Sequence, residues 1–236
     1  MITNLNNMDV SAIYTLVRTL TYTDSTQMPD ATLQVFANIV YHDLENCIVS
    51  QVNEDFFYQE WLADTVIDQR EYTLPVKAGT TAGLKKLLGV SVKYNTTDTE
   101  YQKLRESKLS NNSADLAYYQ DGQPATDPFF IIGDYSVFIY PDPSEAVTSG
   151  LKLYGVCNLG DIATSGTEVS VKIPIEHHEK IAIGMMQYIY QSRGMLNEAV
   201  SALNLYNQKK VDMVNELSDR NKSPVTSLLP NLTYLK

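Results

Sequence analysis

A chain of 236 residues is long enough to bury the core of one elaborated domain or of two small ones. Its formal net charge of −10 is spread along the sequence, which disfavours a broad basic surface and stable binding of nucleic acid. The two cysteines, Cys47 and Cys157, fall in different patterns, so we expect no disulfide framework. There is no basic leader and no apolar run of ~18 residues, so we expect a soluble protein that is neither exported nor inserted into a membrane.

Two helices are predicted in the N-terminal part. Apolar residues recur at helical spacing behind Asp9, an acidic residue suited to capping a first turn, which predicts a helix over residues 9–21. A longer apolar face follows Pro29 and continues to Gln51, which predicts a second helix.

The pattern changes to that of β-strands near residue 56. Aromatic and β-branched residues at 65–67 and 71–74, separated by a polar turn, predict two paired strands. Residues 87–94 predict another strand, whereas residues 100–119 predict short helices or turns that cap the sheet. Residues 151–158 alternate in polarity, which predicts the last strand of this region.

A hairpin is predicted around Gly133-Asp134, which separates the apolar runs 129–132 and 135–140. Glycine at the first loop position supplies the positive φ angle of a type II′ turn. The segment therefore predicts two antiparallel strands joined by a two-residue loop.

Helical spacing returns at Pro174, where proline and nearby acidic residues suit the start of a helix. This third helix is predicted to end at Gly194. A fourth helix is predicted to pack back on the others through Leu196, Ala199, Leu203, Tyr206, Met213 and Leu217. Beyond Arg220, prolines among leucines predict an extended tail.

These elements predict an α+β fold, in which a helical bundle of about four helices carries an inserted antiparallel β module and an extended C-terminal tail. The predicted parts are residues 1–53 for the N-terminal helices, 54–172 for the β-rich module, 173–220 for the helix hairpin and 221–236 for the tail. Two independent lobes are the alternative arrangement.

No pattern in the sequence predicts catalysis or metal binding. His177 and His178 are adjacent, so on a helix they point about 100° apart and cannot share an ion as residues four apart can. Glycine-rich phosphate loops, nucleophile elbows and Cys-X-X-Cys pairs are absent from the sequence. We expect no enzyme, no metal and no cofactor; a catalytic group would have to come from Asp134, Asp142 or His177.

The sixteen tyrosines favour either contacts between subunits or a platform for stacking bases. Stacking platforms normally include lysine and arginine, which are sparse in this chain, so we favour contacts between subunits. The candidate interface residues are Tyr135, Tyr140, Tyr188 and Tyr206.

The order of three motifs resembles that of a known protein family. Residues 69–75 (QREYTLP) enter the strand region, residues 132–143 (IGDYSVFIYPDP) form its hairpin, and residues 173–178 (IPIEHH) open the helix hairpin. In this order and spacing, over about residues 10–220, the chain is similar to the head-to-tail adaptor (connector) proteins of tailed bacteriophages.

The resemblance implies a structural virion protein that assembles as a ring, commonly of twelve copies, beneath the portal at the capsid vertex. Such a ring extends the DNA channel for genome ejection and offers a docking surface to the tail. The implied partners are copies of the chain, the portal protein and tail components, with DNA passing through unbound, after assembly in the host bacterial cytoplasm. In this family a C-terminal segment often reaches the portal, so the candidate portal-binding residues are Leu228, Leu229, Leu232, Tyr234 and Leu235.

A soluble binding module is the alternative function. A β-rich module with a helical cap would recognise a small molecule, a glycan or a peptide through Trp61, Tyr72 and Tyr140. It would be a monomer whose tryptophan fluorescence responds to the ligand.

Overall fold

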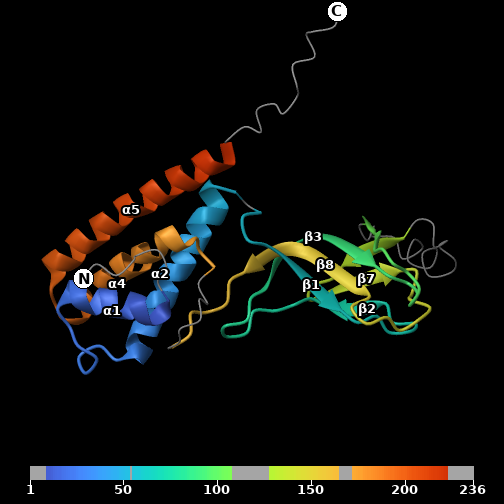
Figure 1. Ribbon diagram of the computed structural model, residues 1–236, viewed down its shortest axis with the longest axis horizontal. Coiled ribbons are helices and arrows are strands. Elements are labelled where there is room, and N and C mark those ends of the chain that lie inside the picture. The colour runs from blue at the N-terminus through green and yellow to red at the C-terminus, as the bar shows by residue number, and fades with distance from the viewer. Residues whose placement is uncertain (1–8, 54, 108–127, 165–171, 223–236) are drawn as a thin grey trace, which may run out of the picture. The chain divides into compact units, whose positions relative to one another are not determined.

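The computed structural model describes residues 9–53, 55–107, 128–164 and 172–222, and its fold is α+β (Figure 1). The chain divides into two compact units. The helical unit comprises residues 1–56 and 161–236, and the strand unit comprises residues 57–160. The strand unit is thus shorter than the predicted β module of residues 54–172.

The described part of the helical unit has four α-helices, with a short 3-10 turn before the third of them. Their bounds are α1 (Val10–Thr21), α2 (Asp30–Gln51), η1 (Ile175–His177), α4 (His178–Ser192) and α5 (Leu196–Lys222). The side chain of Asp9 accepts a hydrogen bond of 2.7 Å from the amide of Ala12, which confirms the predicted N-cap of α1. Gly194 has a φ angle of +73° and joins α4 to α5, which confirms the predicted helix hairpin.

Helix α4 lies at the centre of the helical unit and packs on α1, α2 and α5. Gly184 allows α2 and α5 to approach α4 closely, because a Cβ atom at this position would lie 2.6 Å from Val40 Cγ1 and 2.9 Å from Tyr206 Cε2. The buried apolar side chains include Ile13, Val17, Leu33, Leu44, Ile48, Ile181, Met185 and Ile189.

Residues 161–163 bind along α2 after the chain leaves the strand unit. Gln34 Nε2 donates to the carbonyl of Ile162 at 2.8 Å, and the amide of Ile162 donates to Asn38 Oδ1 at 2.7 Å. His42 Nε2 lies 3.0 Å from a carboxylate oxygen of Asp161. These contacts explain why the helical unit begins again at Asp161.

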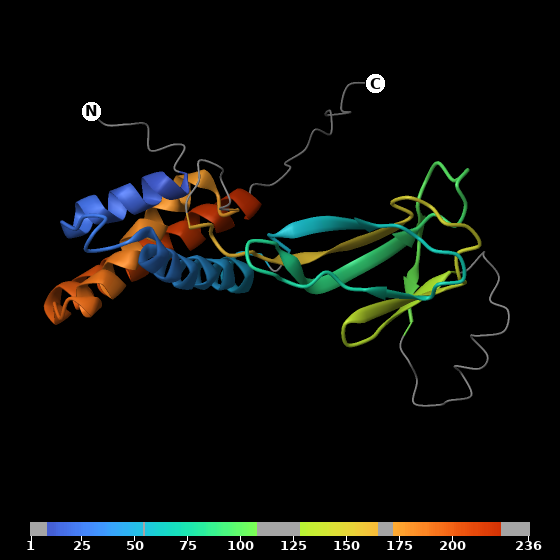
Figure 2. The same cartoon turned by 90° about the horizontal axis from the view of Figure 1, so that it is seen from below.

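The described part of the strand unit consists of two four-stranded sheets, which form separate layers (Figure 2). Sheet A has the strand order β1-β8-β3-β4 and sheet B has the order β2-β7-β6-β5. The bounds are β1 (Tyr58–Ala63), β2 (Glu71–Thr73), β3 (Gly83–Val92), β4 (Gln102–Lys103), β5 (Arg105–Glu106), β6 (Phe129–Ile132), β7 (Ser136–Tyr140) and β8 (Leu151–Asn158).

An apolar core fills the space between the two sheets, as in a β-sandwich. Sheet A contributes residues of β3 and β8, and sheet B contributes residues of β2, β6 and β7. The central members are Tyr72, Val90, Val92, Phe130, Val137, Ile139, Leu151 and Leu153. The predicted strand is confirmed, but its alternation holds only over its first half: Leu151 and Leu153 are buried and the residues that follow each of them are half-buried, whereas residues 155–157 are all buried.

The prediction that residues 65–67 and 71–74 form paired strands is wrong. Strand β1 ends before Thr65 and pairs with β8, whereas β2 pairs with β7 in the other sheet. The amide of Thr65 donates to Val147 at 2.9 Å, and Asp68 has a φ angle of +59°. The chain crosses between the two sheets here, so the polar residues mark a crossover rather than a hairpin.

The predicted hairpin is confirmed in its strands but not in its turn. Strands β6 and β7 are antiparallel, and the amide of Gly133 donates to the carbonyl of Ser136, so the two loop residues are Asp134 and Tyr135. Gly133 has no positive φ angle. A Cβ atom there would lie 3.1 Å from Phe138 Cε2 and from Ser136 Oγ, so glycine serves close packing instead.

Short helices or turns were predicted for residues 100–119, but the described part of this range forms the short strands β4 and β5. Leu104 lies between them and is buried in the sandwich core. The rest of the range lies outside the described residues, as does the predicted tail beyond residue 222.

Candidate functional site

Helix α5 has apolar residues on two faces. One face packs on the helical unit through Ala199, Ala202, Tyr206, Met213 and Leu217. A second row, which we call the α5 row, is exposed and consists of Leu196, Val200, Leu203 and Val211. Members of the row follow each other at spacings of three, four and eight residues, so they lie on one side of the helix.

Helix α2 has a shorter exposed row, formed by Val35 and Ile39. Val35 lies about two turns and Ile39 about one turn before Asp43, so all three residues lie on the same side of α2. Leu203 precedes Tyr206 by about one turn of α5. Asp43 and Tyr206 are hydrogen-bonded, so the α2 row and the α5 row converge next to this bond.

Asp43, Tyr206 and Lys210 form a polar junction between α2 and α5. Tyr206 donates its hydroxyl hydrogen to Asp43 Oδ2 at 2.6 Å, and Lys210 Nζ lies 3.0 Å from the same oxygen. Lys210 Nζ also lies 5.3 Å from the centroid of the Tyr206 ring. Burial, followed by the adjacent Asp43 carboxylate, raises the pKa of Tyr206, so the phenol stays protonated and acts as the donor.

Helices α2 and α5 run in the same general direction, as Figure 1 also shows. Phe36 stacks on Tyr188 of α4 at 5.6 Å between ring centroids, whereas Val40 lies beside Gly184. Helices α2 and α4 are therefore antiparallel, and the start of α2 lies toward the end of α4, where the turn to α5 begins. The start of α5 lies at that turn, so the α2 row and three of the four members of the α5 row, all except Val211, lie in the first halves of their helices.

The candidate interface tyrosines lie in different environments. Tyr206 is buried in the junction, and Tyr140 is buried against Phe129 with ring centroids 4.8 Å apart. Tyr188 is half-buried by its stacking on Phe36. Tyr206 and Tyr140 are thus occupied inside the chain and offer no free surface, which corrects the prediction for these two residues.

Tyr135 is the candidate that the structure places on the surface. Its side chain is 75 % exposed and lies in the loop of the β6–β7 hairpin. The candidate portal-binding residues, Leu228, Leu229, Leu232, Tyr234 and Leu235, lie outside the described residues.

Three of the residues considered for metal binding or catalysis have structural contacts, whereas Asp134 is exposed in the loop of the β6–β7 hairpin. His178 Nε2 lies 2.8 Å from the carbonyl oxygen of Ile173, and His177 Nδ1 lies 2.8 Å from Lys180 Nζ. Arg70 donates to Asp142 at 2.6 Å. In the described ranges, no group of three or more histidines, cysteines or acids is placed to hold a metal ion.

His177 is completely buried, and its Nε2 atom has no hydrogen-bond partner among the described residues. Burial, followed by the ammonium group of Lys180, lowers the pKa of the imidazole. A neutral ring can accept the hydrogen bond from Lys180, whereas a charged ring would place two cations together in a buried position.

Two residues of the alternative binding module, Trp61 and Tyr72, belong to the sandwich core, whereas Tyr140 lies in a separate buried cluster with Phe129 and Ile131. Tyr72 and Tyr140 are buried, and Trp61 is half-buried against the core between the sheets. The amide of Val66 donates to the Tyr72 hydroxyl at 3.2 Å, so the polar end of this side chain is used within the fold. These three residues do not form an exposed aromatic surface.

Leu196 and Leu203 were predicted to lie on the buried face of α5, and the structure places both on the exposed row. The signal that could have revealed the row is the presence of Val200 and Val211, which widen the apolar part of the helix beyond one face.

When the chain is compared with protein-family models and with curated proteins, none of them matches it. Among the described helices, none has both the length and the apolar character that a membrane span requires. We define the candidate site by its geometry alone, as the α2 row, the α5 row and the junction that holds these two helices together.

Proposed function

We propose that this chain is a structural virion protein that forms a ring, with twelve copies as the expected number, between the portal and the tail of a tailed bacteriophage. The ring extends the DNA channel for genome ejection and provides the docking surface for the tail. It has no catalytic role, and it is assembled in the host bacterial cytoplasm before it becomes part of the virion.

The observation that carries the proposal is the α5 row. Leu196 is 67 % exposed and Val200 is 58 % exposed, although both lie in a long helix whose other side is packed. Exposed apolar rows on a rigid helix are typical of surfaces that bind another protein. When the row of one copy meets a different surface of the next copy, repetition of the contact gives a ring if the rotation between copies closes.

The remaining parts of the chain have roles in the same proposal. We propose that the four helices form the bundle of the ring wall, that the β module is an insertion into this bundle, and that the extended tail binds the portal through Leu228, Leu229, Leu232, Tyr234 and Leu235. The net charge of −10 favours passage of DNA without binding, because a negative wall repels phosphates. The motif order described for residues 10–220 supports the same assignment.

The alternative, a ligand- or glycan-binding module, has less support. Its aromatic residues are buried, as described above for Tyr72 and Tyr140. A monomer that binds no capsid would restore this alternative.

The test is light scattering on the purified chain, followed by electron microscopy of portal-bearing, DNA-filled capsids mixed with it. We expect a ring of density beneath the portal that is absent from capsids alone. A chain that stays monomeric and leaves the capsid vertex unchanged would refute the proposal.

The role of the α5 row is tested by the double variant Leu196→Gln/Val200→Gln. Both positions are exposed and glutamine is a good helix former, so the thermal stability should change little. We expect ring formation to be lost. Leu205→Gln is the matched control, because Leu205 is exposed on the opposite side of α5 and should not affect the ring.

A further inference from the structure

The outer face of sheet A combines lysines and tyrosines. In β1 and β8, residues that alternate with the core residues Trp61 and Leu153 point away from the sandwich core. They include Tyr58 and Glu60 of β1 and Lys152 and Tyr154 of β8. Lys93 follows β3 directly. Tyr101 precedes β4, which pairs with β3, and Lys103 belongs to β4. We call this surface the lysine–tyrosine face.

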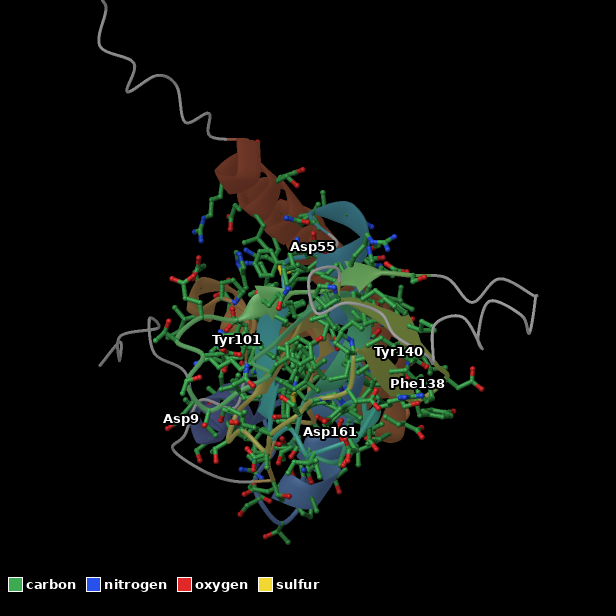
Figure 3. The ribbon with its side chains drawn as sticks, turned by 90° about the vertical axis from the view of Figure 1, so that its right-hand side faces the viewer. Asp9, Asp55, Tyr101, Phe138, Tyr140 and Asp161 are labelled. Carbon is green, nitrogen blue, oxygen red and sulfur yellow. The ribbon has the colours of Figure 1, made fainter. Side chains whose placement is uncertain are left out.

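Tyr101 holds two ammonium groups at the centre of this face. Lys93 Nζ lies 4.8 Å and Lys152 Nζ lies 4.6 Å from the centroid of the Tyr101 ring. The Tyr101 hydroxyl donates to the carbonyl of Ser149 at 2.6 Å, which fixes the ring. Figure 3 shows Tyr101 on a different side of the strand unit from the buried Tyr140.

The lysine–tyrosine face is positive although the chain is acidic. Lys152 lies 3.3 Å from Glu60, and Tyr58 donates to the same carboxylate at 3.1 Å. Within the described part of the chain, no carboxylate forms a salt bridge with Lys93 or Lys103. The Asp98 carboxylate interacts electrostatically with Lys93. Within the described residues the face thus combines three ammonium groups, on Lys93, Lys103 and Lys152, with two carboxylates, on Glu60 and Asp98, in a chain with 28 acidic and 18 basic residues.

The face is also hollowed. A depression of about 380 Å³ is lined by Tyr58, Tyr101, Tyr154 and Lys103, with Gly89 among the lining residues. A Cβ atom at Gly89 would lie 3.8 Å from Tyr154 Cδ2, an ordinary van der Waals contact, so a side chain fits at this position without a clash. Leu88 also lines the hollow and is partly exposed, which adds an apolar element to the charged surface.

We infer that the lysine–tyrosine face binds an acidic surface of a second copy of this chain. Charge complementarity identifies this occupant, because the face is locally positive and the rest of the same chain carries the excess of acidic residues. Tyrosine with lysine and leucine around a hollow also suits a protein partner, which can insert one side chain between the rings.

The charge of the face further determines the symmetry of the contact. Two lysine–tyrosine faces repel each other, so two copies cannot pair through the same patch. The contact must join different surfaces of the two copies, and such head-to-tail contacts produce rings or filaments rather than two-fold dimers. The inference rests on the proposed ring and adds to it a second contact between copies, besides the one made by the α5 row.

Single-stranded nucleic acid is the competing partner for a surface with tyrosine and lysine. The structure favours the protein partner, because the Tyr101 ring already lies beneath two ammonium groups that a stacked base would have to displace. The net charge of −10 also opposes the approach of a polyanion.

The test compares the double variant Lys93→Glu/Lys103→Glu with the wild-type chain by sedimentation velocity over a range of concentrations. A second arm measures ring occupancy on portal-bearing capsids. The control variant Lys85→Glu/Lys209→Glu makes the same change in net charge at two positions outside the hollow. Melting curves of all three proteins check the fold.

We expect the Lys93→Glu/Lys103→Glu variant to associate at least ~10-fold more weakly than the wild type, with the control unchanged. Salt should weaken the association of the wild type more than that of the variant, because partly exposed charges are screened beyond about 10 Å at 0.1 M salt. Gly89→Leu is expected to weaken association without a change in charge, because leucine fills the hollow.

The outcomes separate the inference from the proposed function. If the wild type forms rings and the Lys93→Glu/Lys103→Glu variant forms them equally well, the inference is refuted and the proposed function remains. If the wild type forms no assembly in solution or on capsids, both are refuted. If the wild type instead binds a fluorescent single-stranded oligonucleotide and the variant does not, the face is a nucleic-acid site and the inference is likewise refuted.

Discussion

The hydroxyl of Tyr206 and the carboxylate of Asp43 join α5 to α2 through a hydrogen bond of 2.6 Å. Tyr206 is buried, whereas the Asp43 side chain is partly exposed and also binds Lys210. The bond lies beside the point where the exposed rows of the two helices converge. It therefore joins α2 to the helix whose α5 row we propose to form the ring contact.

The variant Tyr206→Phe removes this hydrogen bond and keeps the packing of the ring. Hydrogen bonds to charged groups contribute roughly 1.5–3 kcal/mol, and the partial exposure of Asp43 places the expected loss of stability at the lower end of that range. The measurement is urea unfolding followed by circular dichroism. Tyr190→Phe is the control, since that hydroxyl makes an exposed contact of 3.3 Å with the carbonyl of Leu20 and its loss should cost much less. Equal losses of unfolding free energy in the two variants would show that the bond between Tyr206 and Asp43 stabilises the chain no more than the exposed contact of Tyr190 does.

The variant Gly184→Ala is expected to destabilise the helical unit. Its methyl group would lie 2.6 Å from Val40 Cγ1, and overpacking of this kind typically costs about 1–3 kcal/mol. Alanine is the better helix former by about 1 kcal/mol, which offsets part of this cost. Val40→Ala removes the closer of the two clashes and leaves that with Tyr206 Cε2 at 2.9 Å, so the double variant should be more stable than the sum of the two single effects predicts. Strict additivity in a thermal or urea unfolding series would show that the two residues do not compete for this space.

The pH dependence of stability should contain a contribution from His177. Burial and the ammonium group of Lys180 lower the pKa of His177 in the folded chain below its ordinary value of 6.5. As the pH falls through 6.5, the unfolded chain takes up a proton at His177 that the folded chain does not. The contribution of His177 to stability is therefore fully present above this pH and is lost as the pH falls. We expect His177→Gln to remove this part of the slope in urea unfolding curves recorded between about pH 5 and 7.5. Parallel curves for the two proteins would mean that His177 titrates alike in both states.

Deletion of residues 223–236 should leave a folded chain, because α5 and its buried contacts precede the deleted part. We expect the truncated protein to fail to attach to portal-bearing capsids, as measured by co-sedimentation. The double variant Leu228→Ser/Leu229→Ser should have the same effect, whereas Ser223→Ala/Thr226→Ala should bind normally. Attachment of the truncated chain at normal strength would refute the role of the tail.

The helices could be predicted closely because their signals are local. Asp9 caps α1 and Gly194 separates α4 from α5, as expected from the sequence. Strand β8 was also predictable, since one residue in two of its first half points into the sandwich core. Each of these elements depends on residues within a few positions of one another.

The sheet pairing could not be predicted in the same way. The crossover at Thr65 depends on hydrogen bonds with Val147, which is 82 residues away in the sequence. A polar turn between two apolar runs is compatible with a hairpin and with a crossover, and only long-range pairing distinguishes them. The lysine–tyrosine face was missed for a related reason. Its lysines are scattered in sequence, and the sheet brings Lys93 and Lys152 to the same ring.

The amide of Ile162 lies outside any helix or strand, yet it is bonded to the side chain of Asn38 on α2. An amide held in this way exchanges with solvent only when its partner moves away. Its exchange rate should therefore follow the opening of α2 rather than the fraying of a loop. A single slow amide at Ile162 would thus report on the cooperativity of the helical unit from a residue that is not helical.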